Sequence, residues 1–175
     1  MCIRDRNHRV ATLPQFREAE RLAREGLQRE PNNARWHGLL CESLHYQLLD
    51  DQREAERACR TAVELEPNNA RWHWGLGQVL DIQIMFPEAE AEYRAAVRLE
   101  PNNATYHDFL ALSLYTMNRF AEAEAECREA IRLQPDAARR HSLLSTLLDL
   151  QGRHAEAEAA KTRADQLRNS NNNNR

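Results

Sequence analysis

A seven-residue segment that begins with Pro-Asn-Asn recurs along the chain. It reads Pro-Asn-Asn-Ala-Arg-Trp-His at 31–37 and at 67–73, and Pro-Asn-Asn-Ala-Thr-Tyr-His at 101–107. A weaker copy at 135–141 keeps the proline and the histidine, and the four prolines are separated by 36, 34 and 34 residues. A fixed period of this length is typical of a chain built from stacked supersecondary units, each of which buries its apolar face against its neighbours.

Each repeat unit contains two segments with helical periodicity. In the unit that follows Pro67, Leu76 and Leu80 are four residues apart in the first segment, and Ala89 and Tyr93 are four apart in the second. This spacing puts apolar side chains on one face of a helix, whereas a strand would alternate them. Because proline cannot supply a helical N–H, it ends one unit and starts the next. Each unit is therefore predicted to be a helical hairpin, and the chain to be all-α.

Small residues recur where the two helices of a hairpin must cross closely, since helices approach only where side chains are small. One slot holds Cys41, Gly77, Ala111 and Ser145, and its counterpart on the second helix holds alanine at 55, 89, 123 and 157. With the leucines around the small residue, the large residue or cysteine four positions after the alanine, and the closing proline, the pattern resembles the tetratricopeptide repeat family. The resemblance covers residues 14–168 and implies a right-handed α-α superhelix, or solenoid, of helical hairpins.

The pattern divides the chain into successive segments. Residues 1–13 have no continuous apolar face and are expected to be poorly structured or a spurious leader, and the asparagine-rich residues 169–175 are expected to form a disordered tail. Between them we expect a partial repeat with only a second helix at 14–31, a first repeat with a two-residue insertion near Leu48-Leu49 at 34–67, a second repeat at 70–101, a third at 104–135, and a fourth that forms the C-terminal edge at 138–168.

Composition excludes several classes of partner. The formal net charge is −3 and the pI is near 6.2, so the broad basic field of a nucleic-acid-binding protein is missing. No uninterrupted apolar run reaches the roughly 18 residues of a membrane span, and the N-terminus carries no apolar stretch of the secretory-signal type. We therefore expect no nucleic-acid partner, no membrane partner and a cytoplasmic location.

The four cysteines are Cys2, Cys41, Cys59 and Cys127, and no two of them form a Cys-x-x-Cys pair. Neither a disulfide framework nor a zinc site is indicated, and a reducing compartment is favoured. Cys59 and Cys127 replace a large apolar residue at the helix seam, and Cys41 fills the small slot, so buried and inert thiols are predicted. The alternative is that Cys41 and Cys59 face each other within one hairpin as a redox pair.

Recurring histidines and glutamates invite a metal or catalytic interpretation. Histidines stand at 37, 73, 107 and 141, but equivalent helices of neighbouring repeats lie about 8–10 Å apart, whereas metal ligands lie about 2 Å from one ion. We expect a structural role for these histidines, with no metal and no cofactor. Runs such as 88–92 place alternate glutamates on different helix faces. No phosphate-binding loop and no hydrolase motif occurs, so no enzymatic activity is predicted.

The resemblance also implies where a partner binds. In the tetratricopeptide family the first helices of successive repeats line a concave groove, and fixed positions of each repeat point into it. Carried onto this sequence, these positions give the expected groove residues Arg35, Glu42, Tyr46, Arg71, Trp74, Gln78, Asp81, Asp108, Tyr115 and Arg139. Trp74 has the strongest physical claim, because an exposed tryptophan in a concave surface buries a large area against a partner. The alternative is that Trp74 only packs on its neighbours.

The expected function is that of a non-catalytic protein-protein interaction scaffold that holds a peptide or helix of a partner in this groove. The clamp with which some members grip chaperone C-termini is not expected, because Gly38, Trp74 and Asp108 stand where its lysine would. Two alternatives stay open. The array could present substrates to a larger enzyme such as a glycosyltransferase, or it could self-associate through the partial N-terminal repeat, where Phe16, Leu22 and Leu27 could lack a partner helix.

Overall fold

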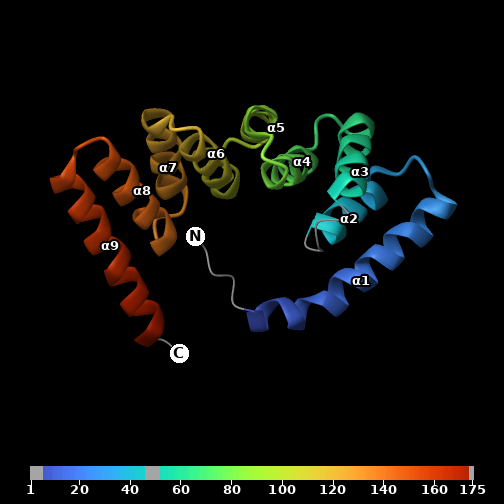
Figure 1. The fold of residues 1–175 in the computed structure, drawn as a ribbon, viewed down its shortest axis with the longest axis horizontal. Helices are drawn as coiled ribbons and strands as arrows, with labels where there is room; N and C mark the ends of the chain where they lie inside the picture. Colours follow the sequence, from blue (N-terminus) through green and yellow to red (C-terminus); the bar gives the residue numbers. More distant parts are fainter. Residues whose placement is uncertain (1–5, 46–51, 174–175) are drawn as a thin grey trace. The chain divides into compact units, whose positions relative to one another are not determined.

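The computed structural model describes residues 6–45 and 52–173, with side chains for 14–45 and 52–170, and this part of the chain is built from α-helices (Figure 1). The helices are α1 (Arg6–Arg29), α2 (Ala34–His45), α3 (Gln52–Leu65), α4 (Ala70–Ile82), α5 (Phe86–Leu99), α6 (Ala104–Thr116), α7 (Phe120–Leu133), α8 (Ala138–Leu150) and α9 (His154–Asn173). The prediction of an all-α chain is confirmed. None of the described helices combines the length and the apolar character that crossing a membrane requires.

Asparagine side chains cap the first helix of three repeats. The Oδ1 atoms of Asn33, Asn69 and Asn103 each accept a hydrogen bond from the backbone N–H two residues later, at 3.0, 3.2 and 3.1 Å. Such a cap satisfies one of the N–H groups that a helix start leaves without an intrahelical partner. The proline before it cannot continue the preceding helix. The repeated segment therefore sets the starts of α2, α4 and α6.

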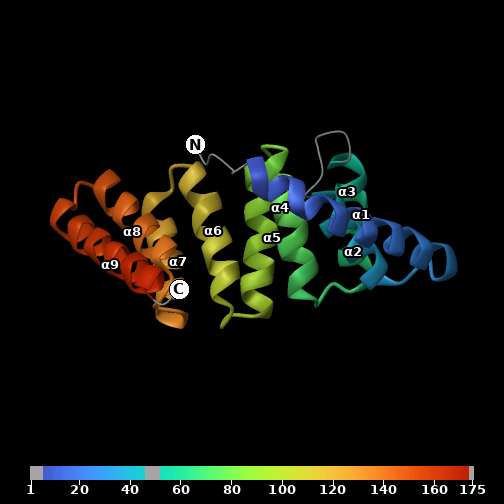
Figure 2. The ribbon, with the colours of Figure 1, turned by 90° about the horizontal axis from the view of Figure 1, so that it is seen from below.

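Contacts divide the chain into two compact units, residues 1–92 and 93–175. In the first unit, α1 packs on α2, α2 packs on α3, and α4 packs on both α2 and α3. In the second unit, α6 packs on α7, α7 on α8, and α8 on α9, and Figure 2 shows the last pair side by side. Within each unit, these helices thus cover the apolar faces of their neighbours, as stacked repeats require.

The small residues predicted at the helix crossings lie in the core. Cys41, Gly77, Ala111 and Ser145 are buried, and so are the alanines at 55, 89, 123 and 157 on the opposing helices. Large leucines and Tyr93 fill the space around these crossings. Close packing of this kind leaves little spare volume at the crossing points.

Both ends of the chain carry more helix than the sequence predicts. Helix α1 begins at Arg6, inside the segment 1–13 expected to be poorly structured, and α9 continues to Asn173, inside the segment expected to be disordered. In α9, extending an existing helix is easy because each added residue gains a hydrogen bond, and no glycine or proline occurs after residue 152. Helix α1 continues through Pro14. The two expectations are corrected for residues 6–13 and 169–173, and the other segment boundaries stay predictions.

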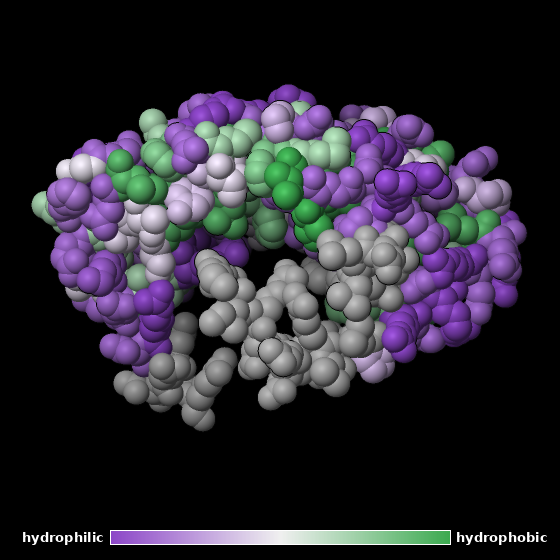
Figure 3. All heavy atoms as spheres, in the orientation of Figure 1, coloured by the Kyte–Doolittle hydropathy of each residue, from purple (hydrophilic) through white to green (hydrophobic). Residues whose placement is uncertain are grey.

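The α4–α5, α6–α7 and α8–α9 turns each use one left-handed residue at the same repeat position. This residue is Asn118 (φ 59°) or Gly152 (φ 75°) in the second unit, and Ile84 (φ 64°) in the first. Asparagine and glycine adopt this conformation readily, whereas a β-branched residue is strained in it. Ile84 is also 72% exposed, and Figure 3 shows a hydrophobic patch over this α4–α5 turn.

Candidate functional site

A small pocket opens between α2 and α4 of the first unit. These are the first helices of their hairpins and are called the inner helices, and the second helices of the hairpins are called the outer helices. Its volume is about 140 Å³, and it is lined by Cys41, Glu42 and His45 of α2 and by Arg71, Trp74, Gly75 and Gln78 of α4. Four of the expected groove residues, Glu42, Arg71, Trp74 and Gln78, therefore surround one cavity. Pockets for small-molecule ligands have volumes of about 300–1,000 Å³, so this one has the size for a single side chain of a larger partner.

An ion pair forms one rim of the pocket. The guanidinium of Arg71 donates from Nε and Nη2 to the two carboxylate oxygens of Glu42, at 2.6 and 2.7 Å. The Arg71 side chain is 59% exposed, and its Cζ atom lies 5.8 Å from the centre of the Trp72 ring. Because the pair is exposed, it adds little to stability, but the bidentate geometry fixes the direction of both side chains.

The other expected groove residues of the first unit lie outside the pocket lining. Arg35 is exposed near the start of α2, and Asp81 is half-buried near the end of α4. Tyr46, together with the insertion near Leu48-Leu49, lies outside the described residues. The structure therefore brings together the middle of the predicted set and adds Cys41, His45 and Gly75, which lie outside that set.

In the second unit, Asp108 is a buried structural residue and not part of a surface. It is 3% exposed, and its carboxylate accepts hydrogen bonds from Nε of Arg140 at 2.9 and 2.8 Å and from Nη2 of Arg139 at 3.0 Å. Arg140 is itself buried and also donates from Nη1 to the carbonyl of Gln134 at 2.9 Å. A buried guanidinium needs a carboxylate partner. Because Asp108 is buried and pairs with Arg140, its assignment to the groove surface is corrected.

Arg140 occupies a repeat position that is aromatic elsewhere. Trp36, Trp72 and Tyr106 hold the equivalent positions. In the first unit the Trp72 ring packs on Gly38, the position equivalent to Asp108, where a Cβ atom would come within 2.2 Å of the ring. The Gly38–Trp72 contact and the Asp108–Arg140 ion pair are thus two solutions to the same packing problem. The arginine at a position that is aromatic in the other repeats is the sequence feature from which the buried ion pair with Asp108 could have been predicted.

The remaining residues of the second unit differ in exposure. The side chain of Arg139 is 65% exposed although one of its nitrogens reaches Asp108. Tyr115 is half-buried, and its ring centre lies 6.1 Å from that of Phe120. Arg139 is therefore available to a partner, and Tyr115 is partly committed to packing within its own hairpin.

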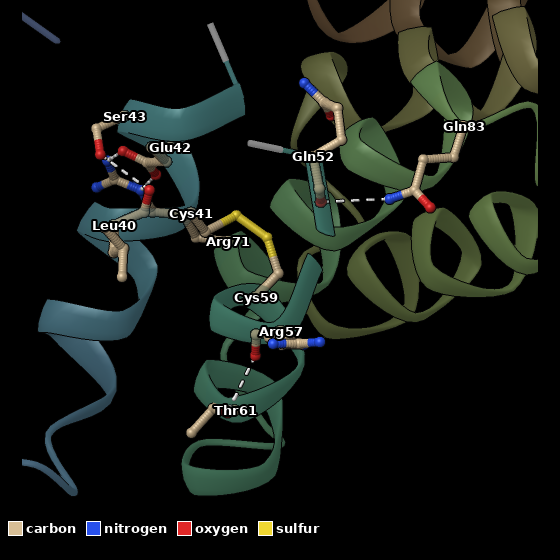
Figure 4. The surroundings of a disulfide bond; sticks show 10 residues. All are labelled: Leu40, Cys41, Glu42, Ser43, Gln52, Arg57, Cys59, Thr61, Arg71 and Gln83. Carbon is tan, nitrogen blue, oxygen red and sulfur yellow. Dashed lines mark hydrogen bonds and ion pairs between the residues drawn. A yellow bond between two sulfur atoms is a disulfide. The ribbon is translucent and has the colours of Figure 1, made fainter. Parts of the chain in front are cut away.

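The cysteines of the first hairpin form a disulfide, which corrects the prediction of inert thiols there. Cys41 on α2 is bonded to Cys59 on α3, with the two Cα atoms 5.2 Å apart (Figure 4). The two residues fill facing slots of one hairpin, which is the alternative that the sequence left open. Cys127 is free and, as predicted, buried, and burial raises the pKa of its thiol to about 12.

The four recurring histidines have a structural role. In each repeat the Nε2 atom donates to the carbonyl of the proline six residues earlier, at 2.8 Å for His37 and His141 and at 2.9 Å for His73 and His107. In two repeats the Nδ1 atom also lies 2.6 Å from a carboxylate oxygen of the following helix, that of Glu92 for His73 and that of Glu126 for His107. No group of three or more potential metal ligands occurs in the described parts of the chain.

Comparisons with known proteins agree with this repeat architecture. A model of the tetratricopeptide repeat family matches residues 49–104 and 109–172. No curated protein matches the chain in sequence.

Several solved structures share the fold. One structure of MamA is 18% identical, with a TM-score of 0.82, and the match covers 98% of this chain and 99% of that one. MamA from Desulfovibrio magneticus RS-1, from residue 41 to its end, is 22% identical, with a TM-score of 0.81 and coverages of 94% and 93%. YrrB, described as a TPR protein with an unusual peptide-binding site, is 17% identical, with a TM-score of 0.74 and coverages of 83% and 74%. At these identities the likeness shows the fold, a helical-repeat solenoid.

Proposed function

Because this chain belongs to the tetratricopeptide repeat family, we propose that it is a non-catalytic scaffold that binds a peptide or helix of a protein partner along its inner helices. The observation that carries the proposal is the α2–α4 pocket, in which Glu42, Arg71, Trp74 and Gln78 converge. YrrB, whose description names a peptide-binding site, supports a partner of this class.

The pocket has the features of an anchor site for one partner side chain. The Trp74 ring and the Cys41 sulfur offer apolar contact, whereas Gln78 and the Glu42–Arg71 pair offer hydrogen-bond partners at the edge. A central pocket that is desolvated on binding, with polar groups around it, is the usual form of an interaction hot spot. The favoured ligand is therefore an apolar side chain carried by an extended or helical segment, whose own backbone meets the polar rim.

We further propose a cytoplasmic location and no nucleic-acid or membrane partner, on the grounds of charge and composition. Self-association remains a second candidate, because α1 leaves Leu22 exposed while it packs on α2. The role of presenting substrates to a larger enzyme rests on family resemblance alone.

Peptide display tests the proposed function. Random peptides would be selected on the immobilised protein, and the affinity of the enriched peptides would then be measured for the wild type, Trp74→Ala and Leu150→Ala. Leu150 is an exposed apolar residue outside the pocket, so its variant is the matched control. We expect Trp74→Ala to weaken binding at least about tenfold, or about 1.4 kcal/mol, and Leu150→Ala to leave it unchanged. Equal binding by all three proteins would rule out the pocket as the site.

A further inference from the structure

Cys41, one half of the disulfide, lines the pocket together with Gly75, and these two residues define its floor. Cys41 lines the pocket and is bonded to Cys59 on the outer helix α3. Across the pocket floor, a Cβ atom placed on Gly75 of α4 would meet the Cys41 sulfur at 3.8 Å. The Cys41 sulfur is bonded to Cys59 of α3 (Figure 4), and it also approaches the α4 backbone at Gly75.

The second unit shows that hairpin packing does not need this bond. Ala111 and Cys127 occupy the positions equivalent to Cys41 and Cys59, and both are buried in a hairpin without a disulfide. Within residues 6–45 and 52–173, the bridge is found only in the hairpin that contributes to the pocket. The bond is therefore not a general requirement of the fold, and it joins a residue of the pocket lining to α3.

Breaking the bond must move atoms at this floor. Bonded sulfurs are about 2.04 Å apart, and two separate thiols need a clearly larger van der Waals separation. Both cysteines are buried in a close-packed crossing that has little spare volume. On the α4 side the Cys41 sulfur faces Gly75, which has no side chain, and both residues line the pocket.

We propose that the Cys41–Cys59 disulfide is a redox switch for the α2–α4 pocket: the oxidised form keeps the pocket open for a partner side chain, and reduction closes it. The switch rests on the proposed function, because it regulates the same site. The partner therefore binds the oxidised protein more tightly, and by linkage a bound partner favours the disulfide by the same factor.

The reductant is a dithiol, whether a small molecule or a protein. One of its thiolates attacks the sulfur of Cys41, and Cys59 leaves as a thiolate that takes up a proton. The second thiol of the reductant then attacks the mixed disulfide and releases Cys41 as a thiol. Two electrons and two protons pass to the protein, and the reductant becomes a disulfide. In a reducing compartment such as the proposed cytoplasm, a disulfide is expected to be transient and redox-sensing.

Fluorine NMR on protein labelled with 5-fluorotryptophan tests the switch without any peptide. The resonance of Trp74, which lines the pocket, is assigned with Trp74→Phe and followed while excess dithiothreitol is added. Thiols are counted in parallel after denaturation. We expect the count to rise by two and the Trp74 resonance to move by more than its linewidth. Cys41→Ala reproduces the Ala111–Cys127 pair of the second unit, so it should fold. The Trp74 resonance of this variant should not shift when the reductant is added.

Each contrary outcome overturns the switch. The switch fails if the isolated protein has four free thiols and treatment with oxidised glutathione does not lower the count to two by forming the disulfide. It also fails if the thiol count rises on reduction while the Trp74 resonance stays in place, or if the Trp74 resonance of Cys41→Ala moves by the same amount as that of the wild type. A peptide selected on the oxidised protein should also lose affinity at least about tenfold on reduction. Because the NMR result needs no peptide, a failure of the switch is distinguishable from a failure of the proposed function.

Discussion

Gly38 packs against the ring of Trp72 so closely that a Cβ atom would come within 2.2 Å of a ring carbon. Gly75 provides the contrast, since a Cβ there would meet the Cys41 sulfur at an ordinary 3.8 Å. We expect Gly38→Ala to destabilise the protein by about 1–3 kcal/mol through overpacking. Gly75→Ala should stabilise it by up to about 1 kcal/mol through helix propensity. Urea unfolding measures both, and equal effects of the two substitutions would contradict the packing described here.

The buried ion pair of the second unit predicts a large mutational cost. Asp108→Asn leaves the guanidinium of Arg140 buried without a carboxylate, which should cost about 3–5 kcal/mol. Asp136→Asn is the control, because Asp136 is exposed and its carboxylate lies 3.8 Å from Arg163, so the loss there should be within about 0.5 kcal/mol. Chemical denaturation gives both values. Similar small losses would show that Asp108 is not a structural residue.

A double substitution tests whether the two packing solutions are equivalent. Asp108→Gly combined with Arg140→Trp recreates the Gly38–Trp72 pair of the first unit. We expect the double variant to lose at least about 2 kcal/mol less stability than the two single variants lose together, because either single change leaves a mismatched partner. Additive losses in the double-mutant cycle would argue against equivalence.

Stability should depend on pH through His107. Its Nε2 atom donates to the carbonyl of Pro101, so its Nδ1 atom donates to Glu126, 2.6 Å away, only when the ring is protonated. The hydrogen bond to Glu126 raises the pKa of His107. Since the pKa is higher in the folded state, the stabilisation is complete below the unfolded value of about 6.5 and is lost as the pH rises through the folded value.

Glu126→Gln removes this interaction, so it should destabilise the protein more at about pH 6 than at about pH 9. Urea unfolding at the two pH values gives the difference. Glu158→Gln on α9, where the carboxylate is exposed, should show no such dependence. A loss that is the same at both pH values for Glu126→Gln would show that the His107–Glu126 contact does not titrate in this range.

The strained turn at Ile84 predicts a stabilising substitution. Ile84→Asn places in the first unit the residue that the equivalent turn of the second unit has at Asn118. Relief of the left-handed strain should add about 1 kcal/mol, and little burial is lost because Ile84 is 72% exposed. Asn118→Ile should lose a similar amount. Thermal unfolding measures both, and a destabilised Ile84→Asn would mean that the isoleucine makes a contact worth more than the strain.

The parts of the fold that depend on local chemistry could be predicted from the sequence. The starts of α2, α4 and α6 follow from the proline and the capping asparagine two residues later, and the small residues at the crossings follow from the repeat period. The histidines were correctly expected to be structural, although their bonds to the proline carbonyls were not foreseen.

The errors concern pairs of residues that are distant in the sequence. The Asp108–Arg140 pair joins residues 32 positions apart, and it forms because one repeat replaces an aromatic residue by arginine while the previous repeat supplies the carboxylate. The partners in the Cys41–Cys59 bond are 18 positions apart, a spacing set by the register of two antiparallel helices and not by a motif. Position within a repeat could not show that one groove candidate is buried and that two cysteines are bonded.

A partner side chain is predicted to enter the α2–α4 pocket. The most direct measurement is a heteronuclear NMR titration of the oxidised, isotope-labelled protein with a peptide enriched by display. We predict the largest shift changes at the backbone amides of Glu42, Arg71 and Gln78 and at the indole N–H of Trp74, with small changes on the outer helices α3 and α7. Changes concentrated on the outer helices, with the pocket signals unmoved, would contradict the account.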